Sequence, residues 1–388
     1  MCSSDLHSPP VVTDGLLEYA ALASAIALVV VWVGYPAVVA ALARCLSAPD
    51  ARGRRQDATV SVVIATRDEA QAIRVRVRDC LSLNYARAKL QVVVALDQRG
   101  HVGAEDLADL PRDQVVVVMG DAPGGKAATL NAAVRAASGT ILVFTDAHQR
   151  FDSDAVRHLV DALSVPRVGV ASGSLAIPAR PGHWTLVSRY WLFERWLRQC
   201  EARLHSCIGV SGAIYAMRRE LWSALPANLI LDDLYVPMKA VLAGWRVAFV
   251  GRARASELRE HSAMAEYRRK VRTLTGVVQL CAWLPEVLLP VRNPVWFQFV
   301  FHKVLRLFTP YWTALVLVWS LPAAVGLLGG SLPAALVVAA TLVLWTVWRR
   351  GPWSSRVRRF AVEAILIHLA VVIAGYNGLR GRWHVWHR

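Results

Sequence analysis

The fold of the chain can be argued from one stretch, Gly139-Thr-Ile-Leu-Val-Phe-Thr-Asp146-Ala-His148. Residues 141–145 are apolar or β-favouring and follow a glycine turn signal, which predicts a strand buried on both faces. The strand ends at Asp146, and His148 lies two positions on, so both side chains can face one side of an extended chain. Ligands of open α/β sheets bind at this carboxyl edge. The alternative is a solvated strand end with His148 as a surface loop residue.

The composition points to membrane segments. The chain has 388 residues, of which 55% are hydrophobic and 15 are Trp. Such values are high for a soluble protein. Because apolar spans are present, the net charge of +16 favours an anionic membrane surface and a phosphorylated substrate over nucleic acid. The six cysteines form no CxxC pair, so neither a metal knuckle nor a disulfide framework is expected.

Hydropathy and charge predict the domain organisation. We expect an N-terminal transmembrane helix within 1–47, a linker at 48–57, an α/β domain at 58–262, amphipathic interfacial helices at 263–307, and about three spans within 308–388. Basic residues cluster directly after the first span, which places the α/β domain in the cytoplasm, with a bacterial inner membrane expected. The three C-terminal spans are 308–328, 332–348 and 360–379. The last would leave Arg380 and Arg382 outside, so either the tail anchors at the interface through Trp383 and Trp386 or this segment is re-entrant.

Strands alternate with helices in the α/β domain. Residues 59–65, 90–96 and 114–119 read as strands, and 68–83 and 127–137 as helices. This alternation predicts a parallel sheet with right-handed crossovers. Candidate ligands then gather at one edge of the sheet: residues 66–69, Asp97, Lys126, Asp146 and His148. Such a gathering predicts a nucleotide and metal pocket.

A second motif, Gly120-Asp-Ala-Pro-Gly-Gly-Lys126, approaches a phosphate-binding P-loop. Ala127 stands where a Mg²⁺-binding Ser or Thr would follow. This departure counts against an ATPase-type loop without excluding contact with a phosphate. A P-loop ATPase component of a membrane transporter nevertheless stays open as one alternative, and a catalytically inactive sugar-nucleotide sensor as another.

Several motifs, taken in order, resemble a known family. They are 60–69 (VSVVIATRDE), 96–97 (LD), 124–131 (GGKAATLN), 144–148 (FTDAH), 209–216 (GVSGAIYA), 232–233 (DD) and 244–246 (GWR). The chain is similar to membrane-bound family-2 inverting glycosyltransferases of GT-A fold, related to cellulose, hyaluronan and poly-N-acetylglucosamine synthases. The resemblance implies an α/β, Rossmann-like and mostly parallel sheet plus transmembrane helices. It also implies sugar transfer, with inversion, from a nucleoside-diphosphate donor, expected to be a UDP-sugar, to a lipid or polysaccharide acceptor.

The resemblance assigns roles to individual residues. Thr66, Glu69 and Asp97 would hold the nucleoside, with Lys126 near the nucleotide. Asp146 would bind Mn²⁺ or Mg²⁺ on the diphosphate, and Asp233 would be the general base. Gly212 and Asp232 would lie beside the base on the acceptor side, with Asp232 alternatively capping a helix. Arg269, Lys270 and Arg272 stand where a Gln-x-x-Arg-Trp motif, absent from this chain, closes over the donor.

The metal motif also departs from the family pattern. It reads Asp-Ala-His, so His148 would be the second metal ligand, and imidazole favours Mn²⁺ over Mg²⁺. The expected partners are the donor, a lipid or glycan acceptor and membrane lipids, without nucleic acid.

Overall fold

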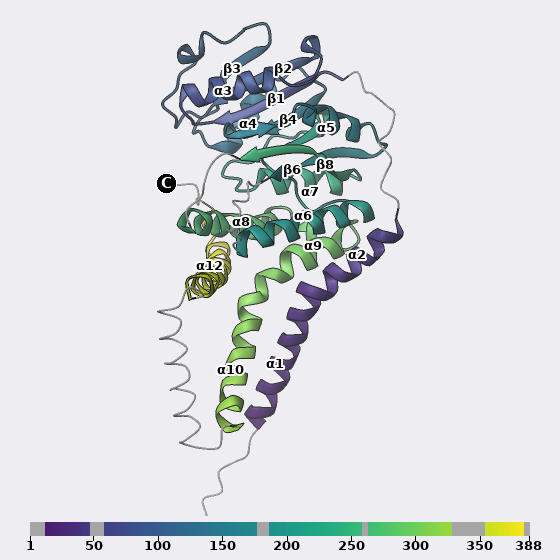
Figure 1. Cartoon of the computed structure of the whole chain (residues 1–388), viewed down its shortest axis with the longest axis vertical. Helices are drawn as coiled ribbons and strands as arrows, with labels where there is room; N and C mark the ends of the chain where they lie inside the picture. The colour runs from purple at the N-terminus through teal and green to yellow at the C-terminus, as the bar shows by residue number, and fades with distance from the viewer. Residues whose placement is uncertain (1–11, 47–57, 177–185, 258–262, 328–353, 384–388) are drawn as a thin grey trace, which may run out of the picture.

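The computed structural model describes residues 12–46, 58–176, 186–257, 263–327 and 354–383. Figure 1 shows an α/β unit, a layer of helices beneath it, and two long helices that extend away from that layer. The layer contains α6 (Leu186–Leu204), α8 (Ala263–Trp283) and α9 (Trp296–Phe299). The long helices are α1 (Val12–Val29) and α10 (Thr309–Leu327). A π-helical turn, η1 (Val30–Gly34), joins α1 to α2 (Tyr35–Cys45).

One eight-stranded sheet organises the α/β unit, in the order β3-β2-β1-β4-β7-β6-β8-β5. The strands are β1 (Val60–Thr66), β2 (Leu90–Leu96), β3 (Val115–Met119), β4 (Ile141–Thr145), β5 (Gln149–Phe151), β6 (Val168–Ala176), β7 (Tyr215–Arg218) and β8 (Arg246–Glu257). The pairs β1–β2, β1–β4, β2–β3 and β6–β8 are parallel, whereas β4–β7, β6–β7 and β5–β8 are antiparallel. The prediction of a parallel sheet is therefore correct for the first four strands, and the sheet as a whole is mixed.

Helices cover both faces of the sheet. α3 (Ala70–Leu81) and α5 (Ala155–Leu163) pack on one face, and α4 (Lys126–Ala136) and α7 (Asp232–Leu242) on the other. Because successive side chains of a strand point to opposite faces, Val62 joins the α3/α5 core and Val63 the α4/α7 core. β4 is buried along its whole length, as its unbroken apolar run predicts.

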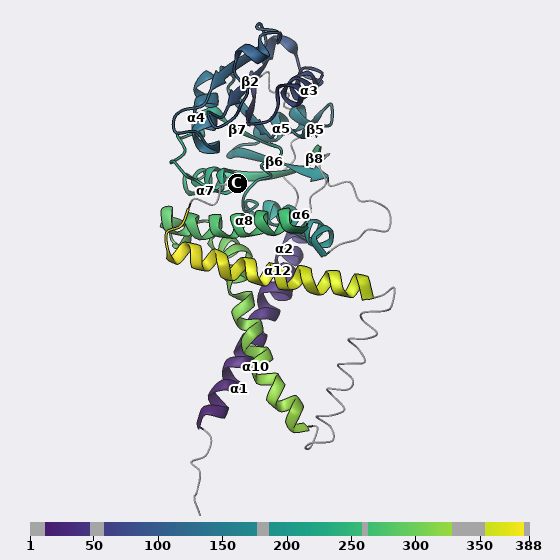
Figure 2. The same cartoon turned by 90° about the vertical axis from the view of Figure 1, so that its left-hand side faces the viewer.

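The C-terminal helix α12 (Ser354–Leu379) includes the predicted span 360–379, but it lies along α8. Figure 2 shows it running across α10 and α1 rather than beside them. The contact with α8 is close: a Cβ added at Gly378 would lie 2.3 Å from Val278, and Asn377 Nδ2 donates to Thr275 Oγ1 at 3.4 Å. Among the described residues, two segments are long and apolar enough to cross a membrane, Leu17–Cys45 and Ala361–Leu379. The predicted span 332–348 falls outside the described residues.

Candidate active site

A cavity of about 600 Å³ opens at the carboxyl ends of β1, β2 and β4. Six of the residues proposed from the sequence contribute to its lining: Thr66, Asp97, Lys126, Asp146, His148 and Arg272. Glu69, Arg269, Gly212, Asp232 and Asp233 are not among the described residues that line it. The cavity nevertheless lies next to the Asp232–Asp233 pair, because Lys126 contacts both the cavity and Asp232.

Lys126 is positioned by a glycine turn. Gly124 and Gly125 have φ of 83° and 99°, a conformation that side chains disfavour, and α4 starts at the next residue. Asp97 Oδ1 accepts hydrogen bonds from the backbone N–H of Gly125 at 2.9 Å and of Arg99 at 3.1 Å. A Cβ at Gly124 would lie 2.6 Å from that same oxygen, so the turn requires glycine. Asp97 therefore fixes the loop that carries Lys126, besides lining the cavity.

Lys126 connects two groups of carboxylates. Its Nζ lies 3.1 Å from Asp232 Oδ1 and 3.9 Å from Asp146 Oδ1. Burial alone would lower the pKa of Lys126, but the nearby charges of Asp232, Asp146 and Asp233 raise it above its ordinary value. The amino group is therefore a fixed positive charge at the edge of the cavity. Asp232, for which a capping role was one alternative, has its carboxylate in an ion pair with this lysine.

Asp233 is held at the start of α7 by its backbone. Its carbonyl accepts a hydrogen bond from Val210 N–H at 2.8 Å, and its Oδ2 would lie 3.2 Å from a Cβ added at Gly212. Burial and the charge of Asp232 raise the pKa of Asp233, while Lys126 and Arg272 oppose that rise. A carboxylate with a raised pKa is a stronger base, which is what proton abstraction from a hydroxyl requires.

Asp146 and His148 both line the cavity, as their spacing predicted. The Asp146 side chain is 47% exposed, so its carboxylate can accept a ligand. His148 Nε2 lies 2.6 Å from Asp68 Oδ1, and Thr66 Oγ1 donates to Asp68 Oδ2 at 2.8 Å. A carboxylate that orients an imidazole through its other ring nitrogen is typical of metal-binding histidines. Asp68, which sequence reasoning did not single out, belongs to the strand-end stretch 66–69 that it did.

These side chains fit a divalent cation in part. Within the described residues, no three His, Cys, Asp or Glu side chains are grouped closely enough to hold a metal by themselves. Asp146 and His148 would be two protein ligands, and the oxygens of a bound diphosphate would supply others. A carboxylate with an imidazole is compatible with Mn²⁺.

The basic run of α8 divides between two sides. Arg272 lines the cavity, and burial lowers its pKa while Asp233 opposes the shift. Arg269 packs over the ring of Trp191 at 5.6 Å and Lys270 over Tyr190 at 4.5 Å, both on α6. Of the basic residues expected to close over the donor, the structure brings Arg272 to the cavity.

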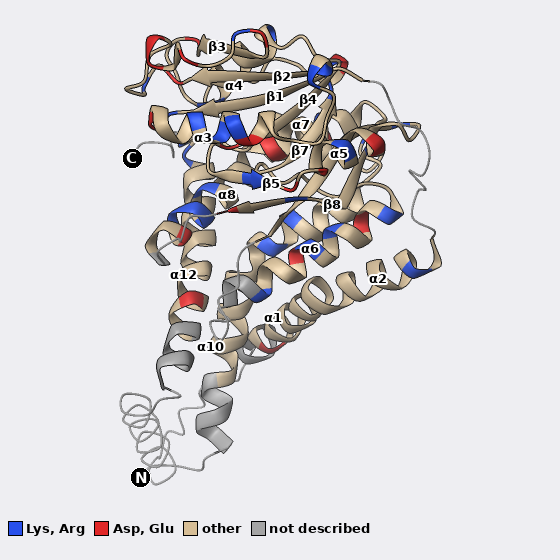
Figure 3. Cartoon of the chain, turned by 45° about the horizontal axis from the view of Figure 1, so that its top comes forward, with Lys and Arg blue, Asp and Glu red and all other residues tan. Residues whose placement is uncertain are grey.

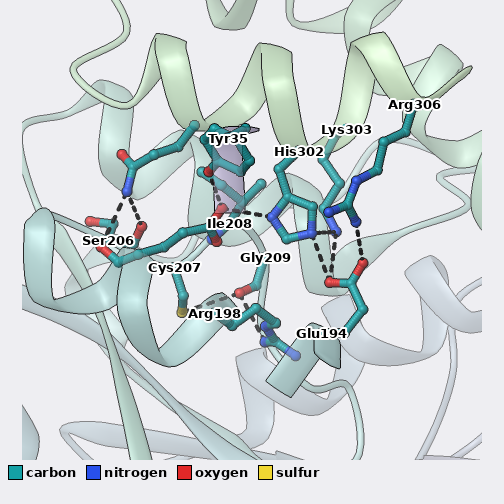
Figure 4. Close-up of polar contacts among 12 residues, drawn as sticks. Tyr35, Glu194, Arg198, Ser206, Cys207, Ile208, Gly209, His302, Lys303 and Arg306 are labelled. Carbon is teal, nitrogen blue, oxygen red and sulfur yellow. Dashed lines mark hydrogen bonds and ion pairs between the residues drawn. The ribbon is translucent and has the colours of Figure 1, made fainter. Parts of the chain in front are cut away.

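A set of polar side chains, most of them buried, lies between α2 and α6, and we call it the polar cluster (Figure 4). Its members are Tyr35, Glu194, Glu201, Gln298, His302, Lys303 and Arg306. His302 lies between two carboxylates, 2.7 Å from Glu201 Oε1 and 2.7 Å from Glu194 Oε2, and the Tyr35 hydroxyl donates to Glu201. The cluster thus joins α2 to α6 and to the π-helical turn η6 (Val300–Val304).

The polar cluster also supports the loop that contacts Asp233. Gln298 Nε2 donates to the carbonyls of Glu201 at 3.1 Å and Ser206 at 3.3 Å. Arg198 donates to the carbonyl of Gly209 at 3.0 Å and to Ser172 Oγ at 3.1 Å, and the same Ser172 Oγ accepts from Ser211 N–H. The loop 206–212 is therefore held from below by α6 and α9, and from above by the backbone of Asp233.

The mixed sheet, with a cavity of cations and carboxylates at its carboxyl edge, places this chain among the α/β proteins that bind their ligand at that edge. Residues 57–276 match the family described as "Glycosyltransferase like family 2". Since the match spans more than half of the chain, the protein belongs to this glycosyltransferase family. A search of curated proteins gave no match.

Several solved structures are similar to this chain to different degrees. A mannosyltransferase of Pyrobaculum calidifontis, PcManGT, solved with GDP-Man and Mn²⁺, is 23% identical, covers 94% of this chain and 99% of its own, and has a TM-score of 0.67. GalNAc-T7, solved with UDP, GalNAc and Mn²⁺, is 16% identical over 54% of this chain and 47% of its own, with a TM-score of 0.41. A mycobacterial protein is 20% identical over 63% and 78%, with a TM-score of 0.42. The first of these identifies the fold as GT-A.

Proposed function

We propose that the chain transfers a sugar, with inversion, from a nucleoside-diphosphate donor to a lipid or glycan acceptor at a membrane. The proposal rests on one juxtaposition: Lys126 lines the cavity and bridges Asp146 to Asp232, beside the raised-pKa Asp233. Fixed positive charge next to a base matches the two demands of glycosyl transfer. The departing diphosphate needs charge stabilisation, and the acceptor hydroxyl needs a proton acceptor.

Each residue has a defined task in this mechanism. Lys126 and Arg272 place positive charge along the cavity where a diphosphate would lie. Asp233 accepts the proton of the acceptor hydroxyl as that oxygen attacks the anomeric carbon from the side opposite the diphosphate. A divalent cation bound by Asp146 and His148 would neutralise the leaving group. Asp68 holds the His148 ring by the hydrogen bond to its Nε2.

The helices outside the α/β unit support the proposed association with a membrane. The α1–η1 segment exposes Leu22, Ile26, Val29 and Val33, each at least 55% accessible. Figure 3 shows Lys and Arg on α6 and α8, in the layer from which α1 and α10 extend. On α6 the exposed Arg195 is accompanied by exposed Leu192 and Trp196, a combination that favours an anionic lipid surface. We place the catalytic unit on the cytoplasmic side of a bacterial inner membrane.

A donor screen tests the proposed activity. Purified protein in lipid is incubated with UDP-glucose, UDP-N-acetylglucosamine or GDP-mannose and Mn²⁺, and release of nucleoside diphosphate is measured. We expect release from one donor, and its loss in Asp146→Ala and Asp233→Asn. Donor binding without release in the presence of lipid extract would favour the inactive sensor. ATP hydrolysis with no sugar-nucleotide turnover would favour the ATPase.

A further inference from the structure

The residues that follow α12, Arg380–Trp383, bring one side chain, Trp383, to the cavity of the candidate active site. Trp383 follows α12 in sequence and lines the same cavity as Lys126, Asp146 and Arg272. More than a hundred residues separate it from each of these side chains, so the fold, not the sequence, brings it there. Its indole ring also packs against the α4/α7 core.

The position of Trp383 is fixed by several contacts. Gly381 has a φ of +60° and turns the chain back at the end of α12, where Arg382 N–H donates to the Asn377 carbonyl at 2.8 Å. The ring of Trp383 meets that of Trp283 of α8 edge to face, with centroids 6.2 Å apart and planes at 73°. The docked helix and the aromatic pair hold the indole at the cavity before any ligand binds.

The chemistry of an indole limits what it can recognise. It carries one N–H hydrogen-bond donor and no charge. Lys126, Arg272 and the glycine turn are therefore better suited to bind the phosphate oxygens of a nucleotide sugar. The flat apolar face of the indole instead suits a ring. A nucleotide sugar has two kinds of ring, the nucleobase and the sugar, and both offer an apolar face to an aromatic side chain.

We propose that Trp383 is a ligand-contacting residue that stacks against a ring of the bound nucleotide sugar, so that the C-terminal segment completes the donor site. This inference rests on the proposed function, because it assumes that the cavity holds a nucleotide sugar. Stacking of a base on an aromatic side chain contributes enough that its loss weakens binding by about five- to a hundredfold.

The test compares Trp383→Leu, which keeps apolar bulk without an aromatic face, with Trp383→Phe, which keeps a ring. Tyr376→Leu is the control: it removes an exposed aromatic ring from α12, the helix that precedes Trp383, and Tyr376 is not among the described residues that line the cavity. Full-length proteins are titrated calorimetrically, in Mn²⁺, with UDP, UDP-glucose, GDP and GDP-mannose. Thermal unfolding is measured on the same samples.

We expect Trp383→Leu to bind at least fivefold more weakly than the wild type, Trp383→Phe to recover part of the loss, and Tyr376→Leu to bind normally. Equal losses for diphosphate and nucleotide sugar would identify the base as the stacked ring, and a loss for the nucleotide sugar alone would identify the sugar. Wild-type affinity of Trp383→Leu for all four probes overturns the inference, as does an equal loss in Tyr376→Leu. If the wild-type protein binds none of the probes, the proposed function itself fails, which is a separate result.

Discussion

The replacement Gly212→Ala tests the position of the base directly. The new methyl carbon would lie 3.2 Å from Asp233 Oδ2 and 3.6 Å from its Cβ. Non-bonded heavy atoms pack best at about 3.5 Å or more, so the carboxylate has to retreat by about 0.3 Å. Because a misplacement of about 1 Å can cost about a hundredfold in rate, a retreat of this size predicts a loss of about three- to tenfold in kcat. Donor affinity should stay near normal, since neither residue lines the cavity.

The matched control is Gly251→Ala on β8. Gly251 is exposed, and the nearest heavy atom to its added Cβ, Cε1 of Phe249, is 3.8 Å away, which is an ordinary contact. We expect this variant to keep wild-type kcat. The two variants are compared by steady-state turnover, donor affinity and thermal unfolding.

A double-mutant cycle makes the test specific. Asp233→Asn should cut kcat by a hundredfold or more, because the amide cannot accept the proton. If Gly212→Ala acts by displacing this base, it should add nothing further in the Asp233→Asn background. Two results would refute the reasoning: wild-type kcat in Gly212→Ala, or a full three- to tenfold loss that persists after the base has been removed.

Four further predictions follow from the same structure. Because the charge of Asp232 raises the pKa of Asp233, Asp232→Asn should move the acidic limb of the kcat/KM profile to lower pH, and an upward shift would contradict the assignment. His148→Asp should keep activity and shift the metal preference from Mn²⁺ towards Mg²⁺ in a metal titration of turnover; an unchanged preference argues against His148 as a ligand. Glu201→Gln removes a buried carboxylate from His302 and should destabilise the protein by roughly 3 kcal/mol in thermal unfolding, whereas a change below about 0.5 kcal/mol would mean that this charge contributes little. Cys45 is exposed at the end of α2, so an impermeant thiol reagent should label it only after cells are permeabilised; labelling in intact cells would reverse the topology.

The strands that carry the site were predictable from the sequence. β1, β2 and β4 consist mostly of apolar residues, with Ser61 in β1 and Gln91 in β2 among them, and burial on both faces produces that pattern. β6 was missed because Gly169, Gly173 and two serines interrupt its apolar run. β5 has three residues, too few for a periodicity to be recognised. The motif 209–216 forms a loop up to residue 214 and then the first two residues of β7.

The site itself was predictable where its residues end strands or start helices. Asp146, Lys126 and Asp97 met at the sheet edge because parallel strands end together there. The ion pair between Lys126 and Asp232 could not be predicted, since it depends on how α4 and α7 sit on one face. The local sequence around Trp383 suggested an interfacial anchor and gave no sign of the cavity that this residue lines. Its place at the cavity depends on α12 lying along α8, and hydropathy had assigned most of that helix to a span.

The polar cluster bears on how parts of this protein can be exchanged with those of a relative. Tyr35 of the N-terminal helix and His302 of the C-terminal half share one buried carboxylate, Glu201, which is fully inaccessible. A chimera that takes α2 from another sequence brings a new side chain to that carboxylate and leaves the charge without its hydroxyl donor. The part of the protein that has to be exchanged as a whole is therefore larger than the catalytic domain. A working graft has to carry α2, α6 and the turn η6 together, or replace all their buried charges at once.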